Sequence, residues 1–436
     1  MSTRNAETWT NWAGAQSCAP RDLIRPRSRP ELSEVVVEAA STGRQITVCG
    51  SGHSFSGAAL TNDLMLDVSA ISGVIEADLS SGLVKVGGGT VLADLNRELD
   101  RLGLAMPNLG DIDVQTIAGA ISTGTHGTGA NLPNISAQVA AIDLVTADGK
   151  IHELTEADTP DELRAARVGV GALGAIAAVT LRTVPAFDLH RIDSPMPLDV
   201  VLADFDDLVA RNQHFEFFTF PFTGVAATIR RNRTDRPRQP RSRVERYIND
   251  VVIENTLGDL MLRATGKVPG MIPRVARFST AFMNQAERID SSHSVFANYR
   301  TLRFNEMEYA LPREVGPKVL RQVLDLIEGE GLPMGMPIEC RTVAGDDALI
   351  SPAYERPSVY IAIHQHHTME WQPYFDAIEK IFISFDGRPH WGKRHSRDAG
   401  SLAGLYPEWE KFQAVRKRFD PNRTFSNEYA LKVLGA

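Results

Sequence analysis

Apolar and polar residues alternate with two different periods over the first 185 residues. Helices are predicted where apolar residues recur at helical spacing, over residues 30–40, 91–99 and 161–167. Strands are predicted where runs of β-prone residues occur, over residues 45–49, 64–68, 83–86, 140–146, 150–154 and 175–183. Short strands and helices interleaved in this way predict an α+β domain of two small lobes.

The pattern changes after Pro185. Strands are predicted over residues 215–220, 225–229, 337–341 and 358–364, and the first two read as a pair. Amphipathic helices are predicted over residues 315–328 and 370–383. The change of character predicts a domain boundary near Pro185.

Eight arginines lie between Arg230 and Arg246, among prolines and polar residues. One interpretation is a site for an anionic partner. The other is a solvated, mobile loop between elements, which we favour because the run contains no aromatic residues. The sequence assigns no purpose to this segment.

Composition bounds the class of protein. The chain has 436 residues, 43% of them hydrophobic, enough for two or three domains, and its net charge of −8 argues against a nucleic-acid partner. Cys18, Cys49 and Cys340 form no disulfide framework and no metal-ligand spacing, which predicts a cytoplasmic protein without a metal. No signal pattern and no long apolar run occur, so we expect no integral membrane segment and leave only peripheral recruitment open.

Two glycine-rich segments carry candidate chemistry. After the predicted strand 45–49, Gly50 and Gly52 let backbone N–H groups approach an anion, and the neighbouring serines add hydroxyl donors. A second loop of the same character, rich in Gly, Ser, Thr and His, covers residues 119–129. Two such loops indicate a large diphosphate ligand held from two sides.

The segment Gly169-Val170-Gly171-Ala172-Leu173-Gly174 matches the dinucleotide fingerprint letter for letter. That fingerprint must leave a strand and open a helix. Here a predicted helix precedes the glycines and a predicted strand follows them. We therefore reject a Rossmann NAD site at this position.

In combination, further segments resemble one flavoprotein family. They are Gly50-Ser51-Gly52-His53-Ser54, Asn108-Leu109-Gly110, Thr123-Gly124-Thr125-His126-Gly127, residues 165–174, Asn305-Glu306-Met307-Glu308-Tyr309, Ile338-Glu339-Cys340-Arg341, residues 388–393 and residues 419–425. The chain resembles the vanillyl-alcohol oxidase family, and within it the sugar-1,4-lactone oxidases and dehydrogenases. The resemblance covers nearly the whole chain.

The resemblance implies the fold and the domain limits. It implies a two-lobed FAD-binding domain of the PCMH type over residues 1–185, with an inserted cap domain of antiparallel sheet and helices over residues 186–384. Residues 385–436 would then return to the FAD-binding domain and the active site.

The resemblance also implies FAD as the cofactor, bonded covalently through His53 at the flavin 8α-methyl. A second link, from a cysteine, occurs in relatives, but residues 115–127 contain no cysteine, so we expect a single link. The other residues expected to bind the cofactor are Gly50, Ser51, Gly52, Ser54, Asp111, Thr116, Gly119, Thr123, Gly124, Thr125, His126 and Ala175.

Four residues are candidates for catalysis. Glu339 and Arg341 lie two apart on a predicted strand, so both side chains point to one face, where they would hold sugar hydroxyls by charged hydrogen bonds. Lys393 would stabilise the negative charge that grows on the flavin as hydride arrives at N5. His364 alternates with Tyr360 and would face the same cavity as Glu339, as a base or a hydroxyl ligand.

The expected reaction is oxidation of an aldono-1,4-lactone such as L-gulono-1,4-lactone at its C2–OH, with hydride passing to flavin N5 and an ascorbate-type product. The electron acceptor stays open between oxygen and a redox protein or quinone. The alternative is an alditol (xylitol-type) oxidase that releases hydrogen peroxide. A non-catalytic flavin- or carbohydrate-binding module and a pyridine-nucleotide-dependent flavin reductase are further alternatives.

Overall fold

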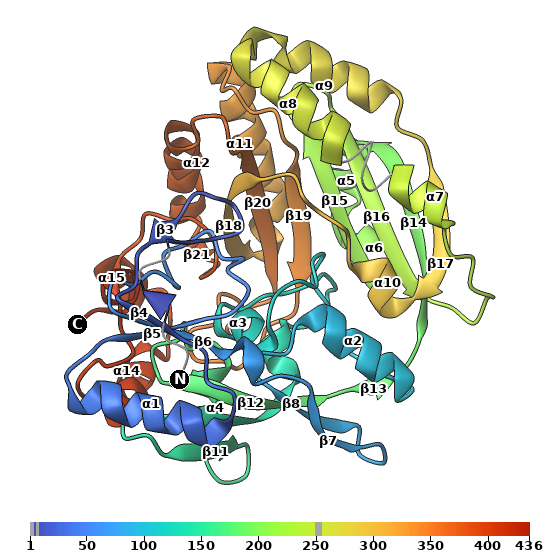
Figure 1. Cartoon of the computed structure of the whole chain (residues 1–436). Coiled ribbons are helices and arrows are strands. Elements are labelled where there is room, and N and C mark those ends of the chain that lie inside the picture. Colours follow the sequence, from blue (N-terminus) through green and yellow to red (C-terminus); the bar gives the residue numbers. More distant parts are fainter. Residues whose placement is uncertain (1–3, 6–7, 249–254) are drawn as a thin grey trace.

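The computed structural model describes residues 4–5, 8–248 and 255–436. Its N-terminal half and its C-terminal helices lie together, and a large sheet with helices of its own lies beside them (Figure 1). This arrangement confirms the α+β class and the antiparallel sheet. Among the described residues, no helix combines the length and the apolar character needed to cross a membrane.

The first lobe is built on a four-stranded sheet with the order β1-β4-β6-β5. Its strands are β1 (Arg4–Asn5), β4 (Asp22–Ile24), β6 (Leu64–Asp67) and β5 (Ile46–Cys49). Helix α1 (Arg29–Ser41) begins at Ser28, whose side chain accepts from the backbone N–H of Glu31. The helix buries Leu32 and Val36 against Ile46 and its neighbours, as its apolar spacing predicts.

The second lobe is an antiparallel sheet with the order β11-β10-β12-β8-β7. Its strands are β7 (Val74–Asp78), β8 (Leu83–Gly87), β10 (Val139–Val145), β11 (Ile151–Thr155) and β12 (Ala175–Arg182). Helices α2 (Leu92–Arg101) and α4 (Pro160–Arg167) share a core with it. Two-residue strands complete the region: β2 (Trp9–Thr10) with β3 (Ser17–Cys18), and β9 (Leu104–Ala105) with β13 (Val184–Pro185).

One element of this lobe differs from the prediction. Residues 119–122, predicted as part of a loop, belong to helix α3 (Ile117–Ser122). The Thr116 side chain accepts from the backbone N–H of Gly119 and so starts the helix. The loop prediction was wrong here because a six-residue helix is too short to show a periodic pattern.

The cap is an eight-stranded antiparallel sheet with the order β17-β14-β16-β15-β19-β20-β18-β21. Its strands are β14 (Asp188–Pro197), β15 (His214–Phe220), β16 (Val225–Arg233), β17 (Ala286–Ser291), β18 (Phe304–Pro312), β19 (Ile338–Val343), β20 (Ser358–His366) and β21 (Arg388–Pro389). The sheet thus spans residues 188–389, next to the proposed domain boundaries at 185 and 384.

The two faces of this sheet have different chemistry. On one face Phe217, Met307 and Ile361 pack against α5 (Leu198–Ala203), α6 (Phe205–Ala210), α11 (Gly316–Glu330) and α12 (Gln372–Ser384). The alternate residues, among them Glu306 and Glu339, point to the other face. Helices α7 (Arg243–Arg246), α8 (Gly258–Lys267) and α9 (Ile272–Ala281) lie between β16 and β17 in the sequence, and α10 (Ser292–Phe296) follows β17.

The C-terminal helices α13 (Ala399–Ala403), α14 (Trp409–Phe419) and α15 (Glu428–Leu434) belong to the N-terminal half. Trp409 and Phe412 share a core with Leu163 of α4, and Phe425 packs with the first lobe. The backbone N–H of Ile46 donates to the carbonyl of Thr424 at 2.7 Å. The tail therefore packs against both lobes of the N-terminal half.

The arginine-rich segment is partly built into the cap. Arg230, Arg231 and Arg233 belong to β16, and the Arg231 guanidinium is buried and donates to Glu216 at 2.8 Å. The interpretation as a solvated loop was therefore wrong for these three arginines. The arginine-rich composition indicated a loop. The ion pair that buries Arg231 joins two strands, and such a pair leaves no local pattern in the sequence that would predict a strand.

Candidate active site

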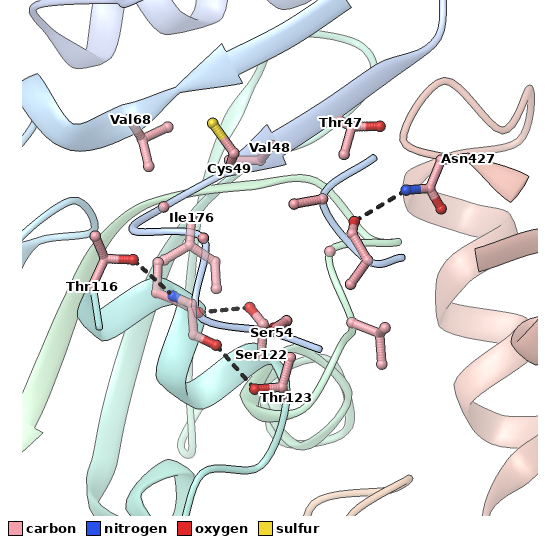
Figure 2. A pocket seen from close by; sticks show the side chains of 18 of the residues that line it. Thr47, Val48, Cys49, Ser54, Val68, Thr116, Ser122, Thr123, Ile176 and Asn427 are labelled. Atoms are coloured by element: carbon pink, nitrogen blue, oxygen red, sulfur yellow. Dashed lines mark hydrogen bonds between the residues drawn. The ribbon is translucent and has the colours of Figure 1, made fainter. Parts of the chain in front are cut away.

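A cavity runs between the two lobes and along the C-terminal tail. It is lined by the end of β5, by the glycine-rich loop after it, by α3, by residues 170–176 and by residues 425–427. Figure 2 shows Thr116, Ser122 and Thr123 around α3, with Asn427 on the opposite side. Asn427 donates to the carbonyls of Gly57, Ala58 and Leu60, which fixes the end of the glycine-rich loop.

This cavity joins a second one of about 470 Å³ under the cap sheet. His53, Ser54, Gln115 and Thr123 line both cavities. A long ligand can therefore extend from the glycine-rich loop to the inner face of the cap.

Most of the residues predicted from the sequence line these two cavities. In the first lie Gly50, Ser51, Gly52, His53, Ser54, Thr116, Gly119 and Thr123. In the second lie Asp111, Thr125, His126, Glu339, Arg341 and Lys393.

Three predicted residues do not line either cavity. Ala175 is a buried core residue between Gly174 and Ile176, which do line the first cavity. Gly124 has a φ of +73°, and a Cβ there would face Pro352 and Val168. His364 lies on the same face of the cap sheet as Glu339, as predicted, but behind Glu306.

The first cavity fits a large polar ligand that contacts the backbone closely. A Cβ on Gly50 would lie 2.2 Å from the Thr116 hydroxyl, so only glycine leaves this approach open. The lining also contains buried polar atoms without a protein partner: Thr47 Oγ1, Gln115 Oε1 and Ser426 Oγ. Unpaired buried polar atoms are costly, so these atoms point to a ligand that hydrogen-bonds them.

His53 lies where the two cavities meet. Its ring stacks on Trp12 with centroids 5.2 Å apart and planes 25° apart. Burial, with a smaller contribution from the charge of Lys393, lowers the pKa of His53 to about 4. The imidazole is therefore neutral at physiological pH and keeps a lone pair on its ring.

The second cavity is built by strand register. Across the cap sheet, Glu216 lies opposite Arg341, and Arg341 lies opposite Tyr360. In the next row Ala362 lies between Glu339 and Glu308, and beyond it Glu306 lies opposite His364. Directly opposed residues share a face of the sheet, so these rows place the charged groups together on the inner face of the cap.

Arg341 is the centre of one cluster. It donates to Glu339 and, through Nε, to Glu216 at 3.1 Å, and its Nη2 lies 3.6 Å from Asp111 Oδ2. Arg300 also donates to Asp111, at 3.0 Å. Burial raises the pKa of Glu339, and Arg341 opposes this effect. The charges of Asp111 and Glu216 raise the pKa further, so it lies above its usual value.

Lys393 is the centre of the other cluster. Its Nζ donates to Glu306 Oε2 at 2.5 Å, and Glu306 Oε1 lies 3.6 Å from His364 Nε2. Burial lowers the pKa of Lys393, but Glu306 and Glu308 outweigh it, so the pKa is raised. His364 donates from Nδ1 to the carbonyl of Pro337 at 2.9 Å. Burial lowers the pKa of His364, but the Glu306 carboxylate that faces Nε2 outweighs this effect, so the pKa is raised.

His126 makes the same kind of contact on the neighbouring row. Its Nδ1 lies 2.9 Å from the carbonyl of Gly127, and its Nε2 lies 3.2 Å from Glu308 Oε1. Its ring packs against Tyr360. Since Glu308 belongs to the cap, His126 links the glycine-rich loop to the cap sheet.

Sequence reasoning assigned no role to Glu306, Glu308, Arg300 or Glu216, which hold the candidate residues in place. For two of them a signal existed. Glu306 and Glu308 alternate with Met307 and Tyr309 in a β-prone segment, which places two carboxylates on one face. Arg300 and Glu216 carry no comparable signal, because their partners are distant in the sequence.

Comparison with known proteins identifies the family. Residues 179–433 match the D-arabinono-1,4-lactone oxidase family, and residues 20–155 match an FAD binding domain. The chain belongs to the D-arabinono-1,4-lactone oxidase family. This membership makes it a flavin-dependent oxidoreductase, with FAD as its cofactor.

Curated relatives extend over almost the whole chain. An L-gulono-1,4-lactone dehydrogenase of Mycobacterium tuberculosis is 43% identical over 98% of this chain and 99% of its own length. The L-gulonolactone oxidase of Bos taurus is 32% identical, covering 97% of each chain. An alditol oxidase of a Streptomyces species is 30% identical over 98% of each chain.

A solved structure shares the fold. The crystal structure of cholesterol oxidase from B. sterolicum superposes with a TM-score of 0.82 over 99% of this chain and 97% of that chain, at 16% sequence identity. The likeness confirms a two-lobed FAD-binding domain with an antiparallel cap. The glycine-rich loop, α3 and the tail are the parts of this chain that would hold the cofactor.

The cradle around Gly50 can be tested by substitution. We expect Gly50→Ala to displace the Thr116 side chain, remove the N-terminal cap of α3, which is worth about 1 kcal/mol, and lower the flavin content of the purified protein by at least half. The ratio of the absorbances at 450 and 280 nm measures the flavin content. Gly404→Ala is the control, since nothing lies within 4 Å of a Cβ there. Full flavin content in Gly50→Ala would contradict the cradle.

Proposed function

We propose that the protein oxidises an aldono-1,4-lactone of the L-gulono-1,4-lactone type at its C2 hydroxyl. The observation that carries the proposal is that Glu339, Arg341 and Lys393 line a cavity that joins the cofactor cavity. The names of the relatives at 43% and 32% identity support the choice of lactone.

The charged residues suit a neutral, hydroxyl-rich substrate. Arg341 donates through its remaining N–H groups to lactone oxygens, and the Glu339 carboxylate accepts from the C2 hydroxyl. Because burial raises the pKa of Glu339, this carboxylate is more basic than an exposed one and takes the hydroxyl proton. When bound, FAD would supply the two-electron acceptor for the hydride that leaves C2. The C2–O bond becomes a carbonyl, and the 2-keto lactone tautomerises to an ascorbate-type enediol.

We propose roles for the other charged groups on the same grounds. Lys393, held by Glu306, would supply a fixed positive charge to the cofactor when it is bound. His364, whose ring donates to the carbonyl of Pro337 and faces Glu306, is proposed as a positioning residue rather than a base. His126 holds Glu308 and thereby the alignment of loop and cap.

We also propose that the protein acts in the cytoplasm, which its three free cysteines support, and that its contact with membranes is peripheral. Oxygen and a redox protein or quinone remain the candidate acceptors. The rate at which oxygen reoxidises the reduced protein separates them.

The alditol alternative rests on a relative at 30% identity over the whole chain. In this protein Asp111, an acidic residue paired with Arg300 and Arg341, lines the cavity. The relatives named for a lactone are more similar to this chain, at 43% and 32% identity, so we place the alditol alternative second.

Anaerobic titration tests the substrate class. We expect L-gulono-1,4-lactone to bleach the flavin absorbance near 450 nm and xylitol to leave it unchanged at the same concentration, because the site is proposed to hold a lactone ring. Bleaching by xylitol alone would transfer the protein to the alditol class. NADPH serves as a control for reductase activity.

Covalent attachment is a separate proposal. A neutral, stacked His53 where the cavities meet has the lone pair that bonding to the flavin 8α-methyl requires. We expect the denatured protein to keep its flavin, seen as a mass increase of one FAD and a fluorescent band in a denaturing gel. We expect His53→Ala to lose both signals. His152→Ala, at a histidine outside both cavities, is the control. Flavin released by denaturation of the unmodified protein would refute the link.

The role of Lys393 predicts a kinetic effect without loss of cofactor. We expect Lys393→Met to slow anaerobic flavin reduction by the lactone by about 10²–10³-fold, the range for loss of one preorganised electrostatic group. Lys411→Met, which removes an exposed lysine, should leave the rate unchanged. Stopped-flow absorbance measures both variants. An unchanged rate in a flavin-loaded Lys393→Met protein would show that the charge is not used.

A further inference from the structure

The helices α8 and α9 form a hairpin that projects from the cap (Figure 1). Their outward faces are apolar. In α8 and its flanks the exposed apolar residues are Leu257, Leu260, Met261 and Val268, and in α9 and its flanks they are Met271, Phe278 and Phe282. The positions recur at helical spacing, so each helix has one apolar stripe directed to solvent.

These stripes are not the result of loosely placed helices. The opposite faces are buried at Leu262 and Thr265 in α8 and at Ile272 and Thr280 in α9. A Cβ on Gly335 would lie 3.0 Å from the Leu262 side chain, so the contact with the cap is close. The hairpin is therefore anchored through one face while it exposes the other.

The two stripes adjoin. The Ser279 hydroxyl contacts the Met261 sulfur at 3.7 Å, and the rings of Phe278 and Phe282 are 4.8 Å apart. Both phenylalanines are 67% exposed and Leu260 is 63% exposed. A large contiguous apolar patch of this kind marks an interaction surface.

The charge of the hairpin contrasts with that of the whole protein. Residues 255–285 contain four cations, Arg263, Lys267, Arg274 and Arg277, and one acid, Asp259, whereas the chain has a net charge of −8. Asp259 is already paired with Arg263 and His366. The apolar patch is thus bordered by positive charge.

We propose that the α8–α9 hairpin is the surface by which this protein docks on a lipid bilayer with anionic headgroups. Exposed aromatic and aliphatic residues would enter the boundary of the acyl chains, and the bordering cations would meet the headgroups. A second copy of this chain suits the patch less well, because a two-fold contact would bring the same cations face to face.

The hairpin is joined to the wall of the candidate active site. Asn255, which precedes α8, accepts from the backbone N–H groups of Thr301 and Leu302 and donates to the carbonyl of Tyr299. Tyr299 and Arg300 line the second cavity. Docking through the hairpin would therefore bring the cavity close to the bilayer.

Vesicle co-sedimentation tests the proposal on the flavin-loaded protein. We expect binding at least tenfold tighter to vesicles of phosphatidylcholine with phosphatidylglycerol than to phosphatidylcholine alone, and weaker binding at high salt. Phe278→Ser/Phe282→Ser should lose at least tenfold in binding. Ile75→Ser/Leu79→Ser, at exposed apolar residues of the second lobe, is the matched control and should bind as the unmodified protein does.

Three results would overturn it: no binding to anionic vesicles, equal loss in both double variants, or full binding by the phenylalanine variant. Sedimentation velocity without lipid addresses the second copy, since dissociation of a dimer by Phe278→Ser/Phe282→Ser would assign the patch to self-association instead. Unchanged thermal unfolding confirms that the variants fold. No substrate is needed, so the result is independent of the proposed lactone oxidation.

Discussion

Pairing of buried charges on the inner face of the cap sheet is the interaction on which the candidate active site depends. Removing a charge from water costs several kcal/mol unless a partner and hydrogen bonds compensate it. Here Glu216, Glu339 and Asp111 surround Arg341, while Glu306 and Glu308 face Lys393 and His126. Loss of one member would leave its partners buried and unpaired, so the site is stable only as a set.

This network also joins three regions of the chain. Asp111 and His126 come from the N-terminal half, Glu339 and Arg341 from the cap, and Lys393 from the segment that leads into the tail. Electrostatic pairing therefore holds the cap against the cofactor-binding lobes at the cavity where the reaction is proposed to occur. His53, stacked on Trp12, lies at the junction with the cofactor cavity, where burial and the charge of Lys393 lower its pKa.

The cap uses its two faces for different purposes. Apolar residues on one face bury against α11 and α12 and stabilise the sheet. The opposite face can then carry groups that destabilise it in isolation, such as the carboxylate of Glu306, because the packing on the first face offsets their cost. The hairpin α8–α9 extends this scheme, since it is anchored by one face and leaves its other face for a partner.

Local patterns in the sequence were sufficient for much of this fold. Helical spacing located α1, α2, α4, α11 and α12, and β-prone runs located strands such as β5, β10, β12, β19 and β20, because both signals arise from neighbours along the chain. The cap strands β14, β17 and β18 were not predicted. Glycine chemistry marked the loop around Gly50, and the spacing of Glu339 and Arg341 placed both on one face. Short α3 and the strand residues Arg230 and Arg231 escaped, since their conformations are set by capping and by cross-strand partners.

What the sequence determined by itself is thus the set of elements, the glycine-rich cradle and the residue types that could hold a flavin and a sugar. What only the tertiary structure decided is their pairing. The register of β18, β19 and β20 sets Glu306 opposite His364, so this histidine faces a carboxylate that also pairs with Lys393. Such pairing follows from strands distant in the sequence that meet in one sheet, and no local pattern encodes a contact over that separation.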